Sequence, residues 1–238
     1  MTALFVGCRL QWMASYLRVK ICGVTNQADA LKAAELGTDA IGLNFFKESP
    51  RYITPAKGQS IVRDLPPFVE PIGVFVARLL QPVIEPVIEI TEKLCLRTIQ
   101  LHLADEVFAL GKLIAVRMIR PFSVSKKNDL QKIRRYLDKC RRDGGKIPAA
   151  IIVDARVSGQ YGGTGRTVPW NILHDFHPEV PLILAGGLTP ENVAEAVRIV
   201  RPYGVDVASG VEKSPGRKDP DKMKRFIENA REAKERLK

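Results

Sequence analysis

Eight short apolar or β-branched runs recur along the chain, and they limit its possible folds more than any other feature. Their C-terminal ends follow one another about every 27 residues, the length of one strand, one helix and two loops. This alternation predicts βα units around a parallel sheet. We predict strands at 17–22, 40–45, 71–76, 98–102, 113–119, 149–154, 181–185 and 204–208.

The length of the chain agrees with closure of these units into one barrel. It has 238 residues, and a (βα)₈ barrel typically has about 250. An open, doubly wound sheet is the rival architecture, and eight units with polar residues at the strand ends favour the closed α/β barrel. We therefore predict a single barrel domain over 17–238, with 1–16 as an N-terminal extension. Met13 stands just before the first strand and is a possible alternative start.

Helix signals fall between the predicted strands. Thr25 is placed to cap a helix through 28–36, and Gly37 to end it. A capping hydroxyl followed by proline, which suits the first helical position, occurs twice. The further predictions are Thr54-Pro55 and Thr189-Pro190 as helix starts, Pro86 as the start of a third helix, and short helices near 106–110 and 170–175.

Cysteine usage and hydropathy bound the setting of the protein. Four cysteines lie far apart without a C-x-x-C pair, so we predict reduced thiols, no zinc or other metal site, and a cytoplasmic location. No apolar run approaches the roughly 20 residues that cross a bilayer, and the first residues lack the features of a signal peptide. No membrane partner is expected.

The net charge of +11 raises the question of a nucleic-acid partner. Two segments account for it: 126–146 has nine Lys and Arg against three acids, and 213–238 has ten against five. Both have apolar residues at helical spacing, as in outer helices with a solvated basic face. No aromatic platform or DNA-binding motif accompanies the charge, so we predict no nucleic-acid binding. A basic, non-catalytic binding module remains the alternative from a different class.

Polar and glycine residues follow several predicted strands, at the end where barrel enzymes place their active sites. Cys22, His102 and Asp154 each come directly after apolar residues. Glycines let backbone N–H groups approach an anion, so the glycine-rich ends of the last strands predict a phosphate site. Its residues are Gly163 in the Gly162–Gly165 loop, Gly186, Gly187, Ser209 and Gly210.

Cys22 and Asp154 would face each other across the mouth of a closed barrel, with strands 8 and 7 between them. A phosphate held there would place a sugar between a base and an acid, which suits a proton-shuttling isomerisation. A thiol with a pKa of ~8.5 needs help to act as a base at neutral pH. Lys20 lies about 7 Å deeper on the same strand face, so we expect a structural role for it instead.

At these residues the sequence resembles the phosphoribosylanthranilate isomerases of tryptophan biosynthesis, from about Arg18 to Asn229. The joint order and spacing of the matching stretches make the resemblance specific. These stretches are Val19-Lys20-Ile21-Cys22-Gly23, Ser49-Pro50-Arg51-Tyr52-Ile53, Gly73-Val74-Phe75-Val76, Gln100-Leu101-His102, Asp154 leading to Gly162-Gly163-Thr164-Gly165, Leu184 to Val193, and Val205 to Glu212.

The resemblance implies an Amadori rearrangement of N-(5-phosphoribosyl)anthranilate to 1-(2-carboxyphenylamino)-1-deoxyribulose 5-phosphate, without cofactor or metal. Asp154 would be the general acid and Cys22 the general base. Arg51 would bind the anthranilate carboxylate, and His102 would line the mouth. The expected partner is a small phosphorylated substrate, for a monomer or homodimer. A related barrel acting on another aminoribosyl phosphate, as in histidine biosynthesis, is the second hypothesis, although those enzymes usually pair two aspartates.

Three positions depart from the pattern of the family. Asn44 stands where the family is usually apolar, Ala77 replaces an asparagine after Gly-Val-Phe-Val, and Leu103 replaces a glycine after Gln-Leu-His. None alters Cys22 or Asp154. They bear instead on the pocket around the anthranilate ring and on the fourth loop.

Overall fold

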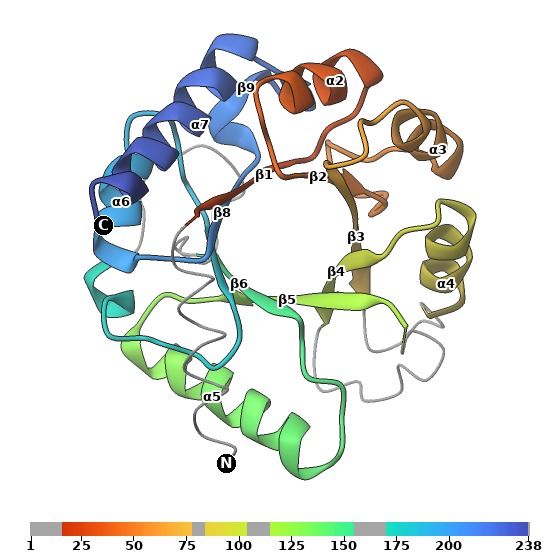
Figure 1. The fold of residues 1–238 in the computed structure, drawn as a ribbon. Coiled ribbons are helices and arrows are strands. Elements are labelled where there is room, and N and C mark those ends of the chain that lie inside the picture. Colours follow the sequence, from red (N-terminus) through yellow and green to blue (C-terminus); the bar gives the residue numbers. More distant parts are fainter. Residues whose placement is uncertain (1–15, 78–83, 104–114, 155–169, 238) are drawn as a thin grey trace.

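The eight predicted strands form a closed parallel barrel. The computed structural model describes residues 16–77, 84–103, 115–154 and 170–237. Each strand pairs with the next in sequence, and β8 closes the ring against β1 (Figure 1). Closure excludes the open sheet. The strands are β1 (Arg18–Cys22), β2 (Ala40–Asn44), β3 (Glu70–Ala77), β4 (Thr98–Leu103), β5 (Arg117–Ser123), β6 (Ala150–Asp154), β7 (Leu182–Ala185) and β8 (Gly204–Val207).

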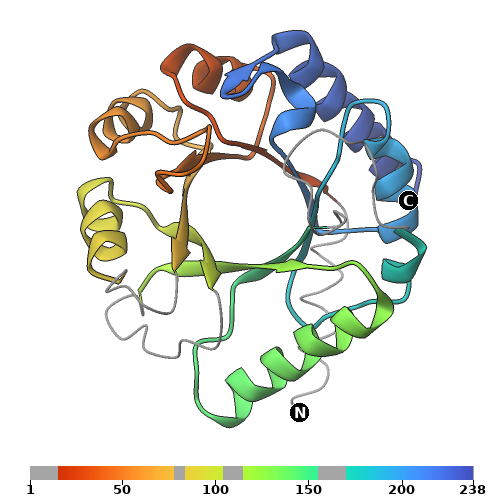
Figure 2. The ribbon, with the colours of Figure 1, turned by 180° about the vertical axis from the view of Figure 1, so that it is seen from behind.

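Helices surround the barrel, as both views along it show (Figures 1 and 2). A two-stranded antiparallel sheet follows β8 and precedes the last helix. The helices are α2 (Gln27–Glu35), α3 (Pro55–Arg63), α4 (Ile84–Lys93), α5 (Lys127–Arg142), α6 (Val193–Val200) and α7 (Pro220–Glu235), with 3-10 helices η2 (Trp170–Leu173) and η3 (Ser209–Val211), and the small sheet is β9 (Glu212–Ser214) and β10 (Arg217–Lys218).

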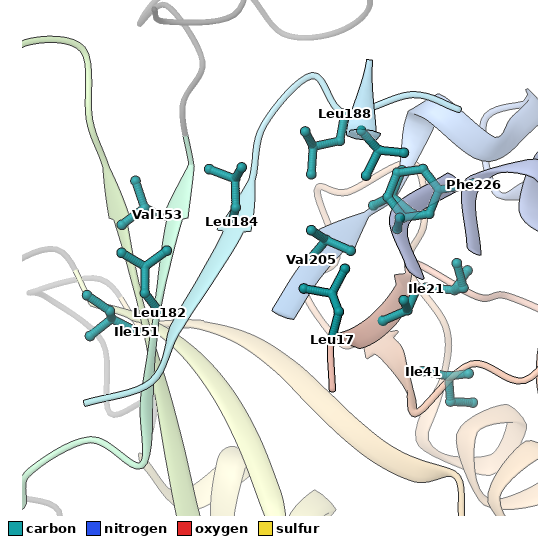
Figure 3. Packing of buried hydrophobic residues seen from close by; sticks show 14 of the residues in the cluster. Leu17, Ile21, Ile41, Ile151, Val153, Leu182, Leu184, Leu188, Val205 and Phe226 are labelled. Carbon is teal, nitrogen blue, oxygen red and sulfur yellow. The ribbon is translucent and has the colours of Figure 1, made fainter. Parts of the chain in front are cut away.

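Alternate residues of each strand face opposite sides of the barrel wall, which produces two apolar clusters. The larger cluster lies between the strands and the helices. Figure 3 shows part of it, including Ile21 and Val205 from the strands and Phe226 from α7. The smaller cluster comes from the opposite strand faces and fills part of the lumen; it consists of Ala40, Ile72, Ile119, Ala150, Ile152, Ile183 and Ala185.

The fifth strand lies about four residues later in the sequence than predicted. It runs from Arg117 to Ser123, whereas the prediction ended at Ile119. The pairing of β5 with β4 ends at Ile119. Pro121 therefore lies in the part of β5 that pairs only with β6. A proline, which lacks an N–H donor, is tolerated at such an edge. The correction matters because it brings Ser123 level with Asp154 in the register.

Two of the predicted helix starts are wrong. The side chain of Asn26, rather than Thr25, caps α2 by accepting from the backbone of Asp29, while the Thr25 hydroxyl donates to the Gly216 carbonyl oxygen at 2.6 Å. Helix α6 begins at Val193, three residues after the predicted Thr189-Pro190 start. Elsewhere the signals hold.

The confirmed signals are local ones. Thr54 caps α3 with Pro55 at the start of the helix, and Gly37 follows α2 with a left-handed φ of +89°. Pro86 lies in the first turn of α4. The short helix predicted near 170–175 is η2, whereas the one near 106–110 lies outside the described residues, as does nearly all of the predicted 1–16 extension.

Both basic segments contain amphipathic outer helices. Helix α5 buries Leu130, Ile133, Leu137 and Cys140, and α7 buries an apolar row beginning at Met223. Two lysines of the second segment depart from the predicted solvated face, because Lys218 is fully buried and Lys234 of α7 is buried as well. No described helix is long and apolar enough to cross a membrane.

Candidate functional site

The mouth of the barrel collects polar side chains from the C-terminal strand ends. Val19 and Ile21 of β1 belong to the outer cluster, so Lys20 and Cys22 face the lumen. The same parity applies to β6, where Ile152 lies in the lumen cluster and Asp154 follows two residues later. Cys22 and Asp154 are both partly exposed. They therefore lie on the lumen faces of their strands, at the mouth.

The order of the strands fixes the relation between these two residues. β8 and β7 separate β1 from β6 around the ring. The loops that follow β7 and β8, with Gly186 and Gly210, thus lie between Cys22 and Asp154 along the rim. This is the order that the sequence predicts for a base, a phosphate site and an acid.

A buried lysine lies beneath Cys22. The Lys20 ammonium is 2.9 Å from Asp206 Oδ1 of β8 and 3.0 Å from Gln100 Oε1 of β4. It also borders the Cys22 sulfur, because a Cβ added at Gly42 would lie 3.1 Å from Lys20 Nζ and 2.7 Å from Cys22 Sγ. Lys20 is thus closer to Cys22 than their spacing along the strand suggests, because the long lysine side chain brings its Nζ to the same point of β2 as the sulfur.

The charges below the mouth act on the thiol in opposite directions. Burial raises the pKa of Cys22 above its ordinary value, and the positive charge of Lys20 opposes the rise. Burial alone would lower the pKa of Lys20, but the Asp206 carboxylate and Cys22 outweigh it and raise this pKa. Lys20 therefore keeps its positive charge at neutral pH, beside a thiol that is mostly protonated.

The side-chain amide of Gln100 connects Lys20 to His102. Its Oε1 accepts from Lys20, so its NH₂ group faces His102 Nε2 at 3.1 Å. An amide NH₂ can only donate, so Nε2 is the unprotonated, accepting nitrogen. The pKa of His102 is lowered to about 4, first by desolvation and then by the charge of Lys20. His102 is therefore neutral at physiological pH, although its side chain is exposed at the mouth.

Arg51 lies against Gly23, the residue after Cys22, and is already paired. Its Nε and Nη2 donate to the two carboxylate oxygens of Glu212 at 2.8 and 2.6 Å. Gly23, with a φ of +69°, leaves room for the Arg51 side chain, because any Cβ there would overlap it. Burial opposes ionisation of Glu212, but Arg51 and Lys218 outweigh it and lower the pKa of this carboxyl.

Lys218 connects the ion pair of Arg51 and Glu212 to the backbone of Cys22. Its ammonium donates to the carbonyl oxygens of Cys22 at 2.6 Å and Ala208 at 3.0 Å, and to Glu212 Oε1 at 3.0 Å. Burial lowers the pKa of Lys218, and the Glu212 carboxylate opposes this. The three hydrogen bonds of the Lys218 ammonium thus hold the C-terminal ends of β1 and β8 next to the carboxylate that binds Arg51.

Asn44, the departure on β2, organises the loop that leads to Arg51. Its side chain donates to Ser49 Oγ at 3.1 Å and accepts from the Phe46 N–H at 2.9 Å. Ser49 Oγ in turn accepts from the Arg51 N–H at 3.1 Å. Asn44 therefore has a local structural reason to be polar here.

The loops after β7 and β8 meet at the predicted phosphate site. Gly186 and Gly187 have left-handed φ values of +90° and +67°. A Cβ at Gly210 would overlap the Leu188 carbonyl oxygen, so only glycine allows this approach. Ser209 opens η3 and is exposed. Gly163 lies outside the described residues.

Asn192 explains why α6 begins late. Its Nδ2 donates to the Gly187 carbonyl oxygen at 3.0 Å, and its Oδ1 accepts from the Thr189 N–H at 2.8 Å. The side chain that could cap α6 is thus turned back to order the loop after β7. This loop is the one predicted to bind phosphate.

The chemistry gathers at this mouth, although a cavity also opens at the opposite end of the barrel. That cavity has a volume of about 700 Å³ and is lined by residues from the N-terminal strand ends, including Arg18, Glu70 and Tyr203. Within the described ranges, no group of three or more His, Cys, Asp or Glu residues could hold a metal ion.

The sequence matches one family model over nearly the whole barrel. The model describes N-(5'-phosphoribosyl)anthranilate (PRA) isomerase and matches residues 19–229. The chain belongs to this family. An N-(5'-phosphoribosyl)anthranilate isomerase from Trichlorobacter lovleyi is 44% identical over 218 residues, which cover 91% of this chain and 99% of that protein. One from Thermotoga maritima is 40% identical, with 90% and 98% covered.

Solved structures of the family have the same fold. The phosphoribosyl anthranilate isomerase from T. maritima aligns with a TM-score of 0.78 and 39% identity, over 90% of this chain and 98% of that one. Another structure holds reduced 1-(o-carboxyphenylamino)-1-deoxyribulose 5-phosphate, with a TM-score of 0.74, 37% identity and the same coverage. The member described here is thus an isomerase of tryptophan biosynthesis that converts phosphoribosylanthranilate to carboxyphenylamino-deoxyribulose phosphate, and the predicted resemblance is confirmed.

Several residues of this isomerase site were not singled out from the sequence. Two of them, Asp206 of β8 and Gln100 of β4, bind Lys20. The others are Glu212 of β9, which binds Arg51, and Lys218 of β10, which binds the Cys22 carbonyl oxygen. Three of them stand within stretches that resemble the family. A signal was therefore present: a lysine, an aspartate and a glutamine at alternating positions inside otherwise apolar strands require partners in a barrel lumen.

Proposed function

We propose that Cys22 and Asp154 perform the isomerisation as a base and an acid on opposite sides of the bound sugar. The observation that carries the proposal is their placement on the lumen faces of β1 and β6, with β8 and β7 between them. A base and an acid that flank one substrate can move protons at two atoms without exchanging places.

The reaction then has two proton transfers. Asp154 donates a proton to the ring oxygen while the C1–O bond breaks and the nitrogen lone pair forms a C1=N iminium. The Cys22 thiolate next removes the C2 proton, and the C–H electron pair becomes a C1=C2 bond that neutralises the nitrogen. The enolamine tautomerises to the ketone. No electron acceptor is needed, which agrees with the prediction of no cofactor.

Arg51 is proposed to bind the anthranilate carboxylate. Its Nε and Nη2 are directed at Glu212, which leaves the N–H groups of Nη1 for a second planar anion. Glu212 would then fix the orientation of the guanidinium before the substrate arrives. His102, neutral and exposed, is proposed to line the same mouth next to the sugar.

The phosphate is proposed to bind at Gly186, Gly187, Ser209 and Gly210, together with Gly163. The close contact of the loops after β7 and β8 supports this, because it brings their backbones to one point of the rim. Backbone N–H groups at glycines are suitable donors for a phosphate, and barrel enzymes frequently bind phosphate after these two strands.

A reduced thiol is required for Cys22 to accept a proton, which supports a cytoplasmic location. Cys22, Cys95 and Cys140 are free cysteines. For assembly, the prediction stays a monomer or a homodimer. One related solved structure concerns monomers of the dimeric enzyme of T. maritima, at 35% identity. Sedimentation of the purified protein over a range of concentrations would decide between the two states.

An activity assay with two substrates tests the proposal. The purified protein should consume phosphoribosylanthranilate, followed by the loss of anthranilate fluorescence, and should leave the aminoribosyl substrate of histidine biosynthesis unchanged. Comparable turnover of the second substrate would favour the rival specificity. The mutations given in the Discussion separate the roles of the individual residues.

A further inference from the structure

The lysine beneath Cys22 is buried and hydrogen-bonded to two other strands. Lys20 is only 4% exposed, and its ammonium lies between a carboxylate of β8 and an amide oxygen of β4. An ammonium has three N–H donors in a compact head group. Asp206 and Gln100 accept two of them, and the third is available for the Cys22 sulfur.

Independent geometry places the sulfur and the ammonium together. A Cβ added to Gly42 of β2 would lie 2.7 Å from Cys22 Sγ and 3.1 Å from Lys20 Nζ. Both atoms thus press against the same point of the neighbouring strand. Any larger residue than glycine at 42 would displace one of them, so Gly42 provides the space in which Lys20 reaches the thiol.

Other charged groups lie near Cys22, and none repeats the position of Lys20. Lys218 reaches the carbonyl oxygen of Cys22 and is paired with Glu212. Arg51 is paired with the same carboxylate. The charged groups that act on the thiol are therefore Lys20 of β1, Asp206 of β8 and Lys218 of β10.

We propose that Lys20 is a positioning residue of the isomerisation, which aims the Cys22 sulfur into the mouth and balances the negative charge of its thiolate. The proposal rests on the role of Cys22 as base. Asp206 and Gln100 hold the ammonium in place, so its charge is fixed before the substrate binds. When the thiol releases its proton to solvent, the thiolate stays beside this cation and can accept the C2 proton.

The electrostatics supports this arrangement. A thiol desolvated by the barrel is harder to ionise, and a nearby cation compensates by stabilising the thiolate. Asp206 keeps Lys20 protonated but also repels the thiolate, so the ammonium must stand between the two. Lys20 is hydrogen-bonded to Asp206 Oδ1 and borders the sulfur beside Gly42.

Replacing Lys20 with methionine tests the proposal. The Lys20→Met variant keeps most of the side-chain volume and removes the charge. We expect the pH of half-maximal alkylation of Cys22 by iodoacetamide to rise by about one unit or more, which means about tenfold less thiolate at neutral pH. Mass spectrometry of the Cys22 peptide separates this reaction from that of exposed Cys95. The kcat should fall by about tenfold at pH 7 and recover towards high pH, with KM little changed.

Controls keep the test decisive if the variant folds poorly. Lys20→Met leaves Asp206 buried without its cation, whereas the double variant Lys20→Met/Asp206→Leu removes both charges, a replacement that buried ion pairs often tolerate. It should show a raised alkylation pH as well. Lys32→Met, on the exposed face of α2, should leave kcat and the alkylation profile unchanged.

The outcomes distinguish this inference from the proposed function. An unshifted alkylation profile and a normal kcat in the folded double variant would overturn the role of Lys20, even if Cys22→Ala is inactive. Substantial activity of Cys22→Ala would instead remove the base on which the inference rests. A raised profile in both Lys20 variants supports it.

Discussion

The lumen of this barrel has two dissimilar walls. Under Cys22, strands β1, β8 and β4 contribute Lys20, Asp206 and Gln100, which form one hydrogen-bonded group. Below Asp154, strands β5, β6 and β7 contribute most of an apolar cluster, which Ala40 of β2 and Ile72 of β3 complete. The same barrel therefore supports its two proposed catalytic groups by different means.

The difference teaches what each group needs from the protein. A thiol is a weak base at neutral pH, and its thiolate gains from a fixed cation. A carboxyl group needs no such cation to donate a proton, and β6 fixes its place through ladders to Ser123 and Ala185 on either side. We infer that the polar wall tunes chemistry, whereas the apolar wall mainly supplies stability.

The largest effect on kcat is expected for the two proposed catalytic residues. Cys22→Ala and Asp154→Asn should each lower kcat by ~10² or more, because each removes one proton-transfer group, while the far-UV circular dichroism stays that of the parent. Steady-state kinetics on the purified variants checks this. Near-normal kcat in either variant would refute the role assigned to that residue.

Arg51→Lys is expected to have the next largest effect. Lysine keeps the charge but cannot form the fork that holds Glu212 and a second carboxylate together. We expect kcat/KM to fall by about tenfold, mostly through KM, since a planar hydrogen-bonded anion contact is worth roughly 1.5–3 kcal/mol. Arg63→Lys, on the exposed end of α3, is the matched control. An unchanged KM would mean that Arg51 does not meet the substrate.

A substitution in the apolar wall should affect stability and spare catalysis. Ile183→Val removes one buried methylene from the lumen cluster, which typically costs about 0.5–1.5 kcal/mol of unfolding free energy. Urea unfolding followed by fluorescence measures this loss. The kcat and its pH profile should match those of the parent. A shifted pH profile would show that the two walls are not separate in function.

His102 provides a pH-dependent effect on the polar wall. Its pKa is about 4 in the folded state and 6.5 ordinarily, so the unfolded chain binds a proton over this interval that the folded chain does not. The contribution of His102 to stability is complete above about pH 6.5 and is lost as the pH falls towards 4. His102→Gln should flatten this part of the stability curve, measured by urea unfolding at several pH values. The exposed His177→Gln should retain the parent slope, and equal slopes in the His102 variant and the parent would contradict the assignment.

The sequence predicted the fold better than the fine structure of the site. Strand positions followed from local apolar runs, and closure followed from their number. Thr25 and Thr189 misled because a hydroxyl can bond elsewhere, here to Gly216 and to the following turn. Which donor caps a helix depends on neighbours that come from distant parts of the chain.

In the site, too, local features were predicted and long-range contacts were not. Cys22 and Asp154 were predicted from their positions after apolar strands, a local property. The contact of Lys20 with Asp206 joins residues that are 186 positions apart, and the length of a lysine side chain decides whether it reaches the thiol. The pairing of Arg51 with Glu212 likewise joins residues that are 161 positions apart. Such contacts follow from three-dimensional packing and not from spacing along the chain.

The most direct test of the central claim is a crystal structure of this protein with reduced carboxyphenylamino-deoxyribulose phosphate bound at the mouth. We expect the phosphate against Gly186, Gly187 and Ser209, and the sugar between the two proposed groups. Cys22 Sγ should lie within about 3–4 Å of C2, near the distance at which reacting atoms meet, with the Asp154 carboxyl near the oxygen that it protonates. A sugar bound away from either side chain, or a phosphate held elsewhere, would contradict the account.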